Sequence, residues 1–122
     1  MHILVIEKNP DLCHLVELHV KLQTSQTLPL ERAESPHRAI EILSGTPPFK
    51  LIVIGMSMAE EGIYEVLTFL KSKDSNIPVI VFTAPTEIDR KRMHQIYNYV
   101  TLVALTDFSG LRLTAKKLLG LS

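Results

Sequence analysis

Short apolar runs alternate with amphipathic segments along the 122-residue chain. A weak run at 27–33 contains Pro29, which suits an edge strand because proline cannot donate to the ladder of a sheet. The other runs are rich in β-branched residues and apolar throughout, which is typical of central parallel strands covered on both faces. These are HILVI (2–6), LIVI (51–54), IPVIVFT (77–83) and VTLVAL (100–105).

Helical patterns fill the segments between the predicted strands. Two of them place a proline at the first helical position, directly after a capping residue, and the helix that begins at Ser35 is expected to end at Gly45. Asp89 stands three residues after Thr86, which resembles a capping box. The predicted helix starts are Asn9, Ser35, Thr86 and Asp107.

The apolar positions predict which side of each helix is buried. In the helix after Asn9, Glu17 and Lys21 are expected to form an outward pair at i,i+4 spacing. The predicted inner positions are Leu12, Leu15, Val16 and Leu22 in the first helix, Ala39, Ile40 and Leu43 in the second, Ile63, Val66, Leu67 and Leu70 in the third, and Leu111, Ala115 and Leu118 in the last.

The alternation of strands and helices predicts one α/β domain over residues 1–122. Right-handed crossovers turn such a chain into a three-layer doubly wound fold with a parallel sheet of five strands and five helices. If the chain continued beyond Ser122, a linker to another domain would begin there.

In open parallel sheets, ligands bind beyond the carboxyl ends of the strands, where the strand order reverses. For the order 2-1-3-4-5, typical of flavodoxin-like folds, four strands line that edge. The residues that follow or end these strands are Glu7 and Lys8, Gly55, Thr83 and Thr106.

The segments ILVIEKNPDL (3–12), LIVIGMSM (51–58) and IPVIVFTA (77–84) resemble the receiver domain of bacterial two-component response regulators, the CheY-like superfamily. The resemblance covers the whole chain. By this resemblance, the family's acid pair falls on Glu7 and Lys8, and its phosphorylated aspartate falls on Gly55. Its Ser or Thr hydroxyl falls on Thr83, and its Lys-Pro pair falls on Thr106 and Asp107. Only Thr83 and half of the acid pair match.

Phosphoryl transfer to a carboxylate needs a nucleophilic oxygen, and glycine has no side chain. The transfer also needs Mg²⁺, which prefers a near-octahedral shell of oxygen ligands. Glu7 alone provides only one carboxylate for such a shell. We therefore expect a pseudo-receiver that is not an enzyme and is not regulated by aspartyl phosphorylation. The remaining alternatives are a phospho-receiver with an unusual acceptor and a flavodoxin-like binder of a small ligand.

Other kinds of site have little support in the sequence. His14 and His19 are five residues apart on one helix and cannot chelate a metal together. No Gly-rich phosphate loop follows a strand, so we expect no cofactor, and a flavin rests on fold analogy alone. The balanced charge gives no bulk attraction to nucleic acid or membrane. A single cysteine, Cys13, and the lack of a signal-peptide pattern suggest the cytoplasm.

The resemblance also implies a protein contact surface on the last two helices and the strand between them, a common dimerisation face in the family. Aromatic and arginine side chains there fit an interface core. We expect the chain to act by contact with a protein partner, an output domain or a second copy of itself. The candidate interface residues are Arg90, Met93, Tyr97, Tyr99, Val103, Arg112 and Lys116.

Overall fold

The computed structural model describes residues 2–21, 29–45, 49–55, 60–83, 90–104 and 107–119. Within these ranges five parallel strands form a single sheet in the order β2-β1-β3-β4-β5. The strands are β1 (His2–Ile6), β2 (Leu30–Ala33), β3 (Phe49–Ile54), β4 (Val79–Thr83) and β5 (Val100–Ala104). The helices are α1 (Pro10–Lys21), α2 (Pro36–Gly45), α3 (Glu60–Ser72), α4 (Arg90–Ile96) and α5 (Phe108–Leu118).

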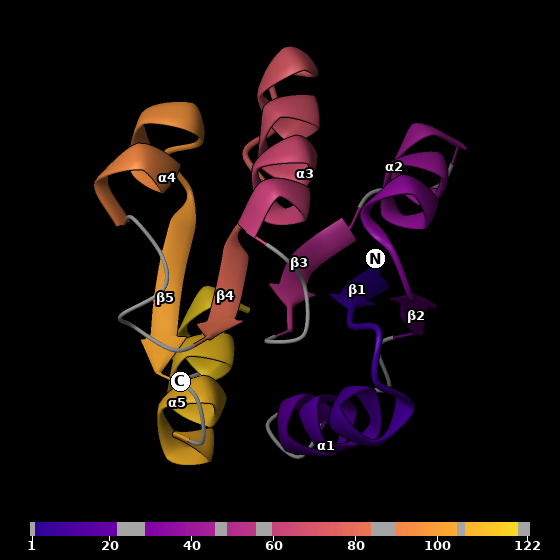
Figure 1. Ribbon diagram of the computed structural model, residues 1–122. Coiled ribbons are helices and arrows are strands. Elements are labelled where there is room, and N and C mark those ends of the chain that lie inside the picture. Colours follow the sequence, from indigo (N-terminus) through magenta and orange to yellow (C-terminus); the bar gives the residue numbers. More distant parts are fainter. Residues whose placement is uncertain are drawn as a thin grey trace.

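Helices cover both faces of the sheet (Figure 1). α2, α3 and α4 lie side by side on one face, and α1 and α5 lie on the other. The predicted three-layer doubly wound α/β fold and its strand order are therefore confirmed. The weak strand run with Pro29 supplies β2, which lies at the edge of the sheet as expected.

The sheet separates two hydrophobic cores. Because successive side chains of a strand point to opposite faces, Leu4 and Ile6 of β1 pack beneath α2 and α3, whereas Ile3 and Val5 pack against α1 and α5. The same alternation holds in β3 and β4. The central strands are buried on both sides, which explains why they are apolar throughout.

Three predicted caps are present. The Asn9 Oδ1 atom accepts a hydrogen bond from the backbone N–H of Asp11 at 2.9 Å. Ser35 Oγ accepts one from the N–H of Arg38 at 3.1 Å, and Asp107 Oδ1 accepts one from Gly110 at 2.9 Å. These bonds satisfy amides that a helix start leaves without partners. Thr86 and Asp89 lie outside the described residues.

The prediction that Glu17 faces solvent and pairs with Lys21 is wrong, because Glu17 is buried and paired with Arg32. The Glu17 side chain accepts two hydrogen bonds from the guanidinium of Arg32 on β2, at 2.5 Å and 2.6 Å. Leu15 was predicted to face inward, but 40% of it is exposed. Helix α1 therefore turns its polar Glu17 toward the edge strand, because a charged partner is available there.

The inner faces of the other helices largely follow the prediction. α3 buries all four predicted positions, and α5 buries Leu111 and Ala115. In α2, Ala39 and Ile42 are the buried positions, while Ile40 and Leu43 are partly exposed. Among the described residues, no helix has both the length and the apolar character needed to cross a membrane.

Candidate functional site

Two strand ends meet at the predicted edge. Glu7 directly follows β1, and its N–H donates to the carbonyl of Ala33 at 2.9 Å. Gly55 directly follows β3, and its N–H donates to the carbonyl of Ile6 at 2.7 Å. These bonds continue the sheet ladder one step past the strands. Residues 7 and 55 are therefore neighbours on a rigid scaffold.

The side chain of Glu7 fills the space above Gly55. Only 3% of Glu7 is exposed, and its Oε1 atom accepts a hydrogen bond from the N–H of Asn9 at 3.1 Å. A Cβ atom added to Gly55 would lie 2.6 Å from Glu7 Cδ and 3.1 Å from Glu7 Cβ, and it would overlap Glu7 Oε2. A glycine at the end of β3 thus makes room for a carboxylate that comes from β1.

The remaining predicted site residues are only partly described. The backbone of Thr83 ends β4 and pairs with Ala104, but the side chain of Thr83 lies outside the described part of the structure. Thr106 lies outside it altogether. Asp107, the next residue, caps α5. Of the predicted site residues, the structure therefore brings Glu7 and Gly55 together.

Among the residues that the structure describes at this edge, the donor set does not fit the Mg²⁺ ion that receiver chemistry uses. Mg²⁺ binds through carboxylates and waters in a near-octahedral shell. Glu7 is a single buried carboxylate already bonded to Asn9, Gly55 supplies no side-chain oxygen, and Lys8 beside them is a cation. Among the described residues, no three His, Cys, Asp or Glu side chains converge as a metal site.

A cavity lies beside this edge, displaced toward β2. It has a volume of about 210 Å³ and opens to solvent. Sequence reasoning missed it because it considered only the strands at the reversal of strand order and left out the edge strand. Its lining residues are Glu7, Lys8, Pro10, Cys13, Arg32, Ala33, Glu34 and Arg38.

Cys13 contributes an inert thiol to this cavity. Its side chain is 3% exposed. Burial raises the pKa of the thiol above its ordinary value, and the nearby Glu17 carboxylate raises it further. A neutral, buried thiol is a poor nucleophile. Cys13 is therefore a packing residue of α1.

Three of the predicted interface residues are core residues. Met93 is fully buried, and Tyr97 and Val103 are 3% and 6% exposed. The hydroxyl of Tyr97 donates to the carbonyl of Ile77 at 2.7 Å and also bonds Ser75 Oγ at 3.1 Å, which ties the residue after α4 to the segment before β4. Assigning these three side chains to a contact surface was wrong, because apolar contacts and the Tyr97 hydrogen bonds hold them inside.

The other predicted interface residues have accessible surface or lie outside the description. Tyr99 is 51% exposed and packs edge-on against Tyr97. Arg112 and Lys116 on α5 are partly exposed, and the side chain of Arg90 is not described. Leu113 of α5 is 68% exposed and was not predicted. Its position opposite Leu111 and Ala115 on the helix was the available signal.

The sequence matches no protein-family model and no curated protein. Solved structures do match. The receiver domain of NtrX from Brucella abortus aligns with a TM-score of 0.75 at 18% identity over 98% of this chain and 99% of that one. The signal receiver domain of the merR response regulator from Colwellia psychrerythraea gives 0.75 at 19% identity over 98% of both chains.

A third match is the response regulator TrrA from Thermotoga maritima, whose structure was solved in complex with Mg²⁺ and BeF. Its TM-score is 0.68 at 21% identity, covering 97% of this chain and 99% of that one. At these identities the likeness concerns the backbone and not the site. The five-stranded order, the helix layers and these alignments together establish that the chain has the CheY-like fold of response regulator receiver domains.

Proposed function

We propose that this chain is a receiver-like signalling module that works without aspartyl phosphorylation and acts through contact with another protein. The observation that carries the proposal is the Glu7 carboxylate in the space above Gly55. An acceptor at position 55 is absent, and its place is filled by a side chain of the neighbouring strand. At position 55 a covalent signal would have neither a nucleophile nor room for one.

The charges at the edge support the same conclusion. A transferring phosphoryl group is stabilised by Mg²⁺ and by fixed cations. Here one buried carboxylate stands beside Lys8, and this donor set does not suit the ion. Removing one electrostatic stabiliser typically slows a reaction by about 10²–10³-fold. The lack of a nucleophile at position 55 is the larger effect, because without it the transfer to that position cannot occur.

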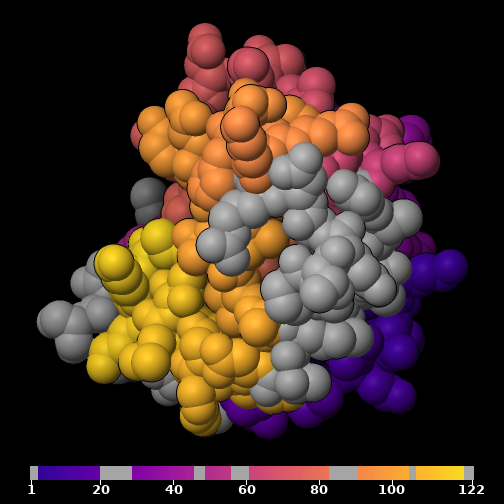
Figure 2. Space-filling model, turned by 60° about the vertical axis from the view of Figure 1, so that its left-hand side comes forward, coloured from indigo at the N-terminus to yellow at the C-terminus, as the bar shows by residue number. Residues whose placement is uncertain are grey.

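Protein contact is proposed on the surface formed by α4, β5 and α5, here called the α4–β5–α5 face (Figure 2). The buried Met93, Tyr97 and Val103 support this face from within. The surface itself offers the half-exposed Tyr99 and the exposed Leu113, with Arg112 and Lys116 partly exposed. Aromatic, aliphatic and arginine side chains of this kind form interface cores. The partner is an output domain, another protein or a second copy.

The first experiment tests the covalent signal. The chain is incubated with acetyl phosphate, and separately with beryllofluoride, each in the presence of Mg²⁺. TrrA from Thermotoga maritima serves as the positive control. We expect no gain in mass and no shift of the backbone amide resonance of residue 55. A phosphate adduct on Glu7 or elsewhere would refute the proposal in favour of an unusual acceptor.

The second experiment tests the contact surface. Sedimentation or light scattering gives the oligomeric state over a range of concentrations, and pull-down with chemical cross-linking identifies bound proteins. We expect Tyr99→Ser with Leu113→Ser to abolish association. The matched control is Leu18→Ser on α1, since Leu18 is 47% exposed. Equal loss in the control variant would place the contact elsewhere.

A further inference from the structure

The cavity at the ends of β1 and β2 lies next to the Glu7–Gly55 contact and is not filled by it. Its volume of about 210 Å³ is smaller than the about 300–1,000 Å³ of pockets for drug-sized ligands. Its floor includes the apolar surfaces of Pro10, Cys13 and Ala33. The size therefore suits a small metabolite and not a dinucleotide or a flavin.

Cations dominate the accessible part of the lining. Lys8, Arg32 and Arg38 all line the cavity. Of the two carboxylates that line it, Glu7 is buried and turned toward Gly55 and the N–H of Asn9. Glu34 is the one exposed carboxylate among the described lining residues. Of the four exposed charged side chains in the lining, three are therefore cations and one is an anion, although Arg32 and Arg38 also pair with acids outside the cavity.

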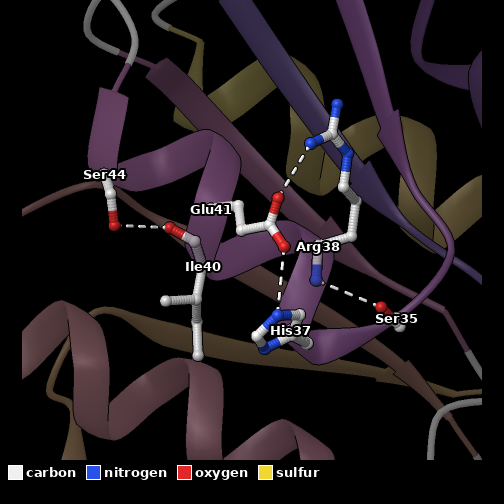
Figure 3. Close-up of polar contacts among 6 residues, drawn as sticks. All are labelled: Ser35, His37, Arg38, Ile40, Glu41 and Ser44. Carbon is white, nitrogen blue, oxygen red and sulfur yellow. Dashed lines mark hydrogen bonds and ion pairs between the residues drawn. The ribbon is translucent and has the colours of Figure 1, made fainter.

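The two arginines are held in place by acids that do not line the cavity. Arg32 binds the buried Glu17, and its side chain is nevertheless 61% exposed. Arg38 binds Glu41, which also pairs with His37 on the same helix (Figure 3). Each pair uses only part of the five N–H donors of a guanidinium. The remaining donors are positioned in advance, which lowers the entropic cost of binding.

Helix starts are not what makes this site cationic. α1 and α2 both begin beside the cavity, but Asn9 and Ser35 already accept hydrogen bonds from their first-turn amides. The positive character comes from the side chains. Guanidinium and ammonium groups bind carboxylates and phosphates through charge-assisted hydrogen bonds, and guanidinium does so with two parallel bonds.

We infer that the cavity between the ends of β1 and β2 binds a small oxyanion, borne by a phosphate or a carboxylate group, through Lys8, Arg32 and Arg38. The site adjoins the edge where receiver chemistry would take place but is distinct from position 55. It does not rest on the proposed function, because an anion could bind here whether or not the chain accepts a phosphoryl group. If both hold, the anion is a non-covalent input to the module.

Inorganic phosphate and succinate are the two probes, each titrated against the full chain at constant ionic strength set with chloride. Amide chemical shifts report binding. We expect saturable shifts centred on residues 8, 33, 34 and 38, with the stronger probe identifying the preferred group. In Lys8→Ala/Arg38→Ala the affinity should fall by about tenfold or more, which corresponds to about 1.4 kcal/mol. Arg32 is left intact because it also neutralises the buried Glu17.

The matched control is Lys71→Ala/Lys117→Ala, which removes one exposed cation from α3 and one from α5 and should leave the affinity unchanged. Shifts that do not saturate, or that are the same in both double variants, would overturn the inference, since either result describes general screening of charge. If Lys8→Ala/Arg38→Ala fails to fold, the test uses Lys8→Gln/Arg38→Gln instead, which removes both charges but keeps more of each side chain than alanine does. The phosphorylation assay above is read separately, so each idea can fail alone.

Discussion

The carboxylate of Glu7 occupies the position from which a side chain at Gly55 would extend. The two residues belong to neighbouring strand ends that are joined by the hydrogen bond from the Gly55 N–H to Ile6. Gly55 is therefore required by its neighbour and not by a turn. The glycine at the end of β3 and the buried acid after β1 form one structural unit.

Gly55→Ala should lower the free energy of unfolding by about 1–3 kcal/mol, the usual cost of overpacking a tight site. The added Cβ would overlap Glu7 Oε2 and force that side chain to move. In a Glu7→Ala background the same substitution should cost much less. Urea denaturation of the four proteins of this cycle gives a coupling energy, and we expect about 0.5–3 kcal/mol.

Gly45→Ala is the matched control for that cycle. A Cβ atom at Gly45 meets no atom within 4 Å, so the substitution should leave stability nearly unchanged. A coupling energy of zero between positions 7 and 55 would mean that Glu7 is not held above Gly55 in solution.

Gly55→Asp should not make the chain a phosphate acceptor. The new carboxylate would compete with Glu7 for one space, and the set of acids needed for Mg²⁺ would still be incomplete. Mass spectrometry after treatment with acetyl phosphate and Mg²⁺ checks this expectation. Gly55→Asp/Glu7→Gly removes the competitor and is the informative comparison. Phosphorylation of the single variant would show that the edge keeps its ion site.

Arg32→Ala should lower the urea midpoint more than Arg38→Ala does. The partner of Arg32, Glu17, is buried, so removal of the guanidinium leaves a desolvated carboxylate without its charge partner. The partner of Arg38, Glu41, is half exposed. Exposed pairs typically contribute only about 0.2–1 kcal/mol. Equal midpoints for the two variants would mean that water already reaches Glu17.

Tyr97→Phe should destabilise the chain by about 1–3 kcal/mol at neutral pH, because it leaves the Ile77 carbonyl without its donor. Burial raises the pKa of Tyr97 above its ordinary value of about 10. A raised folded-state pKa means that this contribution is complete below pH 10 and is lost as pH rises through the folded-state pKa. As pH rises through the alkaline range, the melting temperature of Tyr97→Phe should therefore fall less than that of the parent chain.

Cys13 should react slowly with a thiol reagent in the folded chain at neutral pH. Its side chain is buried and its pKa is raised, so the reactive thiolate is scarce. In urea the same thiol should react at the rate of a free cysteine. A native rate close to the denatured rate would mean that α1 opens readily from the sheet.

The sequence predicts the strands and the helix ends well, because these features depend on interactions between residues that are close in sequence. Neighbours within a few residues decide the alternation of a strand, such as Ile3 and Leu4 on opposite faces of the sheet. They also decide the helix caps at Asn9, Ser35 and Asp107. Periodicity and capping chemistry report such effects directly. The strands, the helices and the doubly wound strand order could therefore be predicted.

Contacts between distant segments were beyond the same reasoning. Glu17 was assigned to an outward pair because its true partner, Arg32, is on another element. Tyr97 was assigned to an interface because tyrosine is common in interfaces. Its hydroxyl instead donates a hydrogen bond to the carbonyl of Ile77 in the protein interior. The missing acceptor at Gly55 was visible in the sequence. The acid that fills its place was not visible, because Glu7 reaches it from the neighbouring strand β1.

The shared space of Glu7 and Gly55 has an evolutionary consequence. A single nucleotide change can turn a glycine codon into an aspartate codon, but here the new side chain would arrive in a space that is already taken. A descendant that acquired a carboxylate at position 55 would also need a smaller residue at position 7. The two positions are therefore constrained to change together, because a chain with the new side chain at position 55 and Glu7 still in place would carry a penalty in folding.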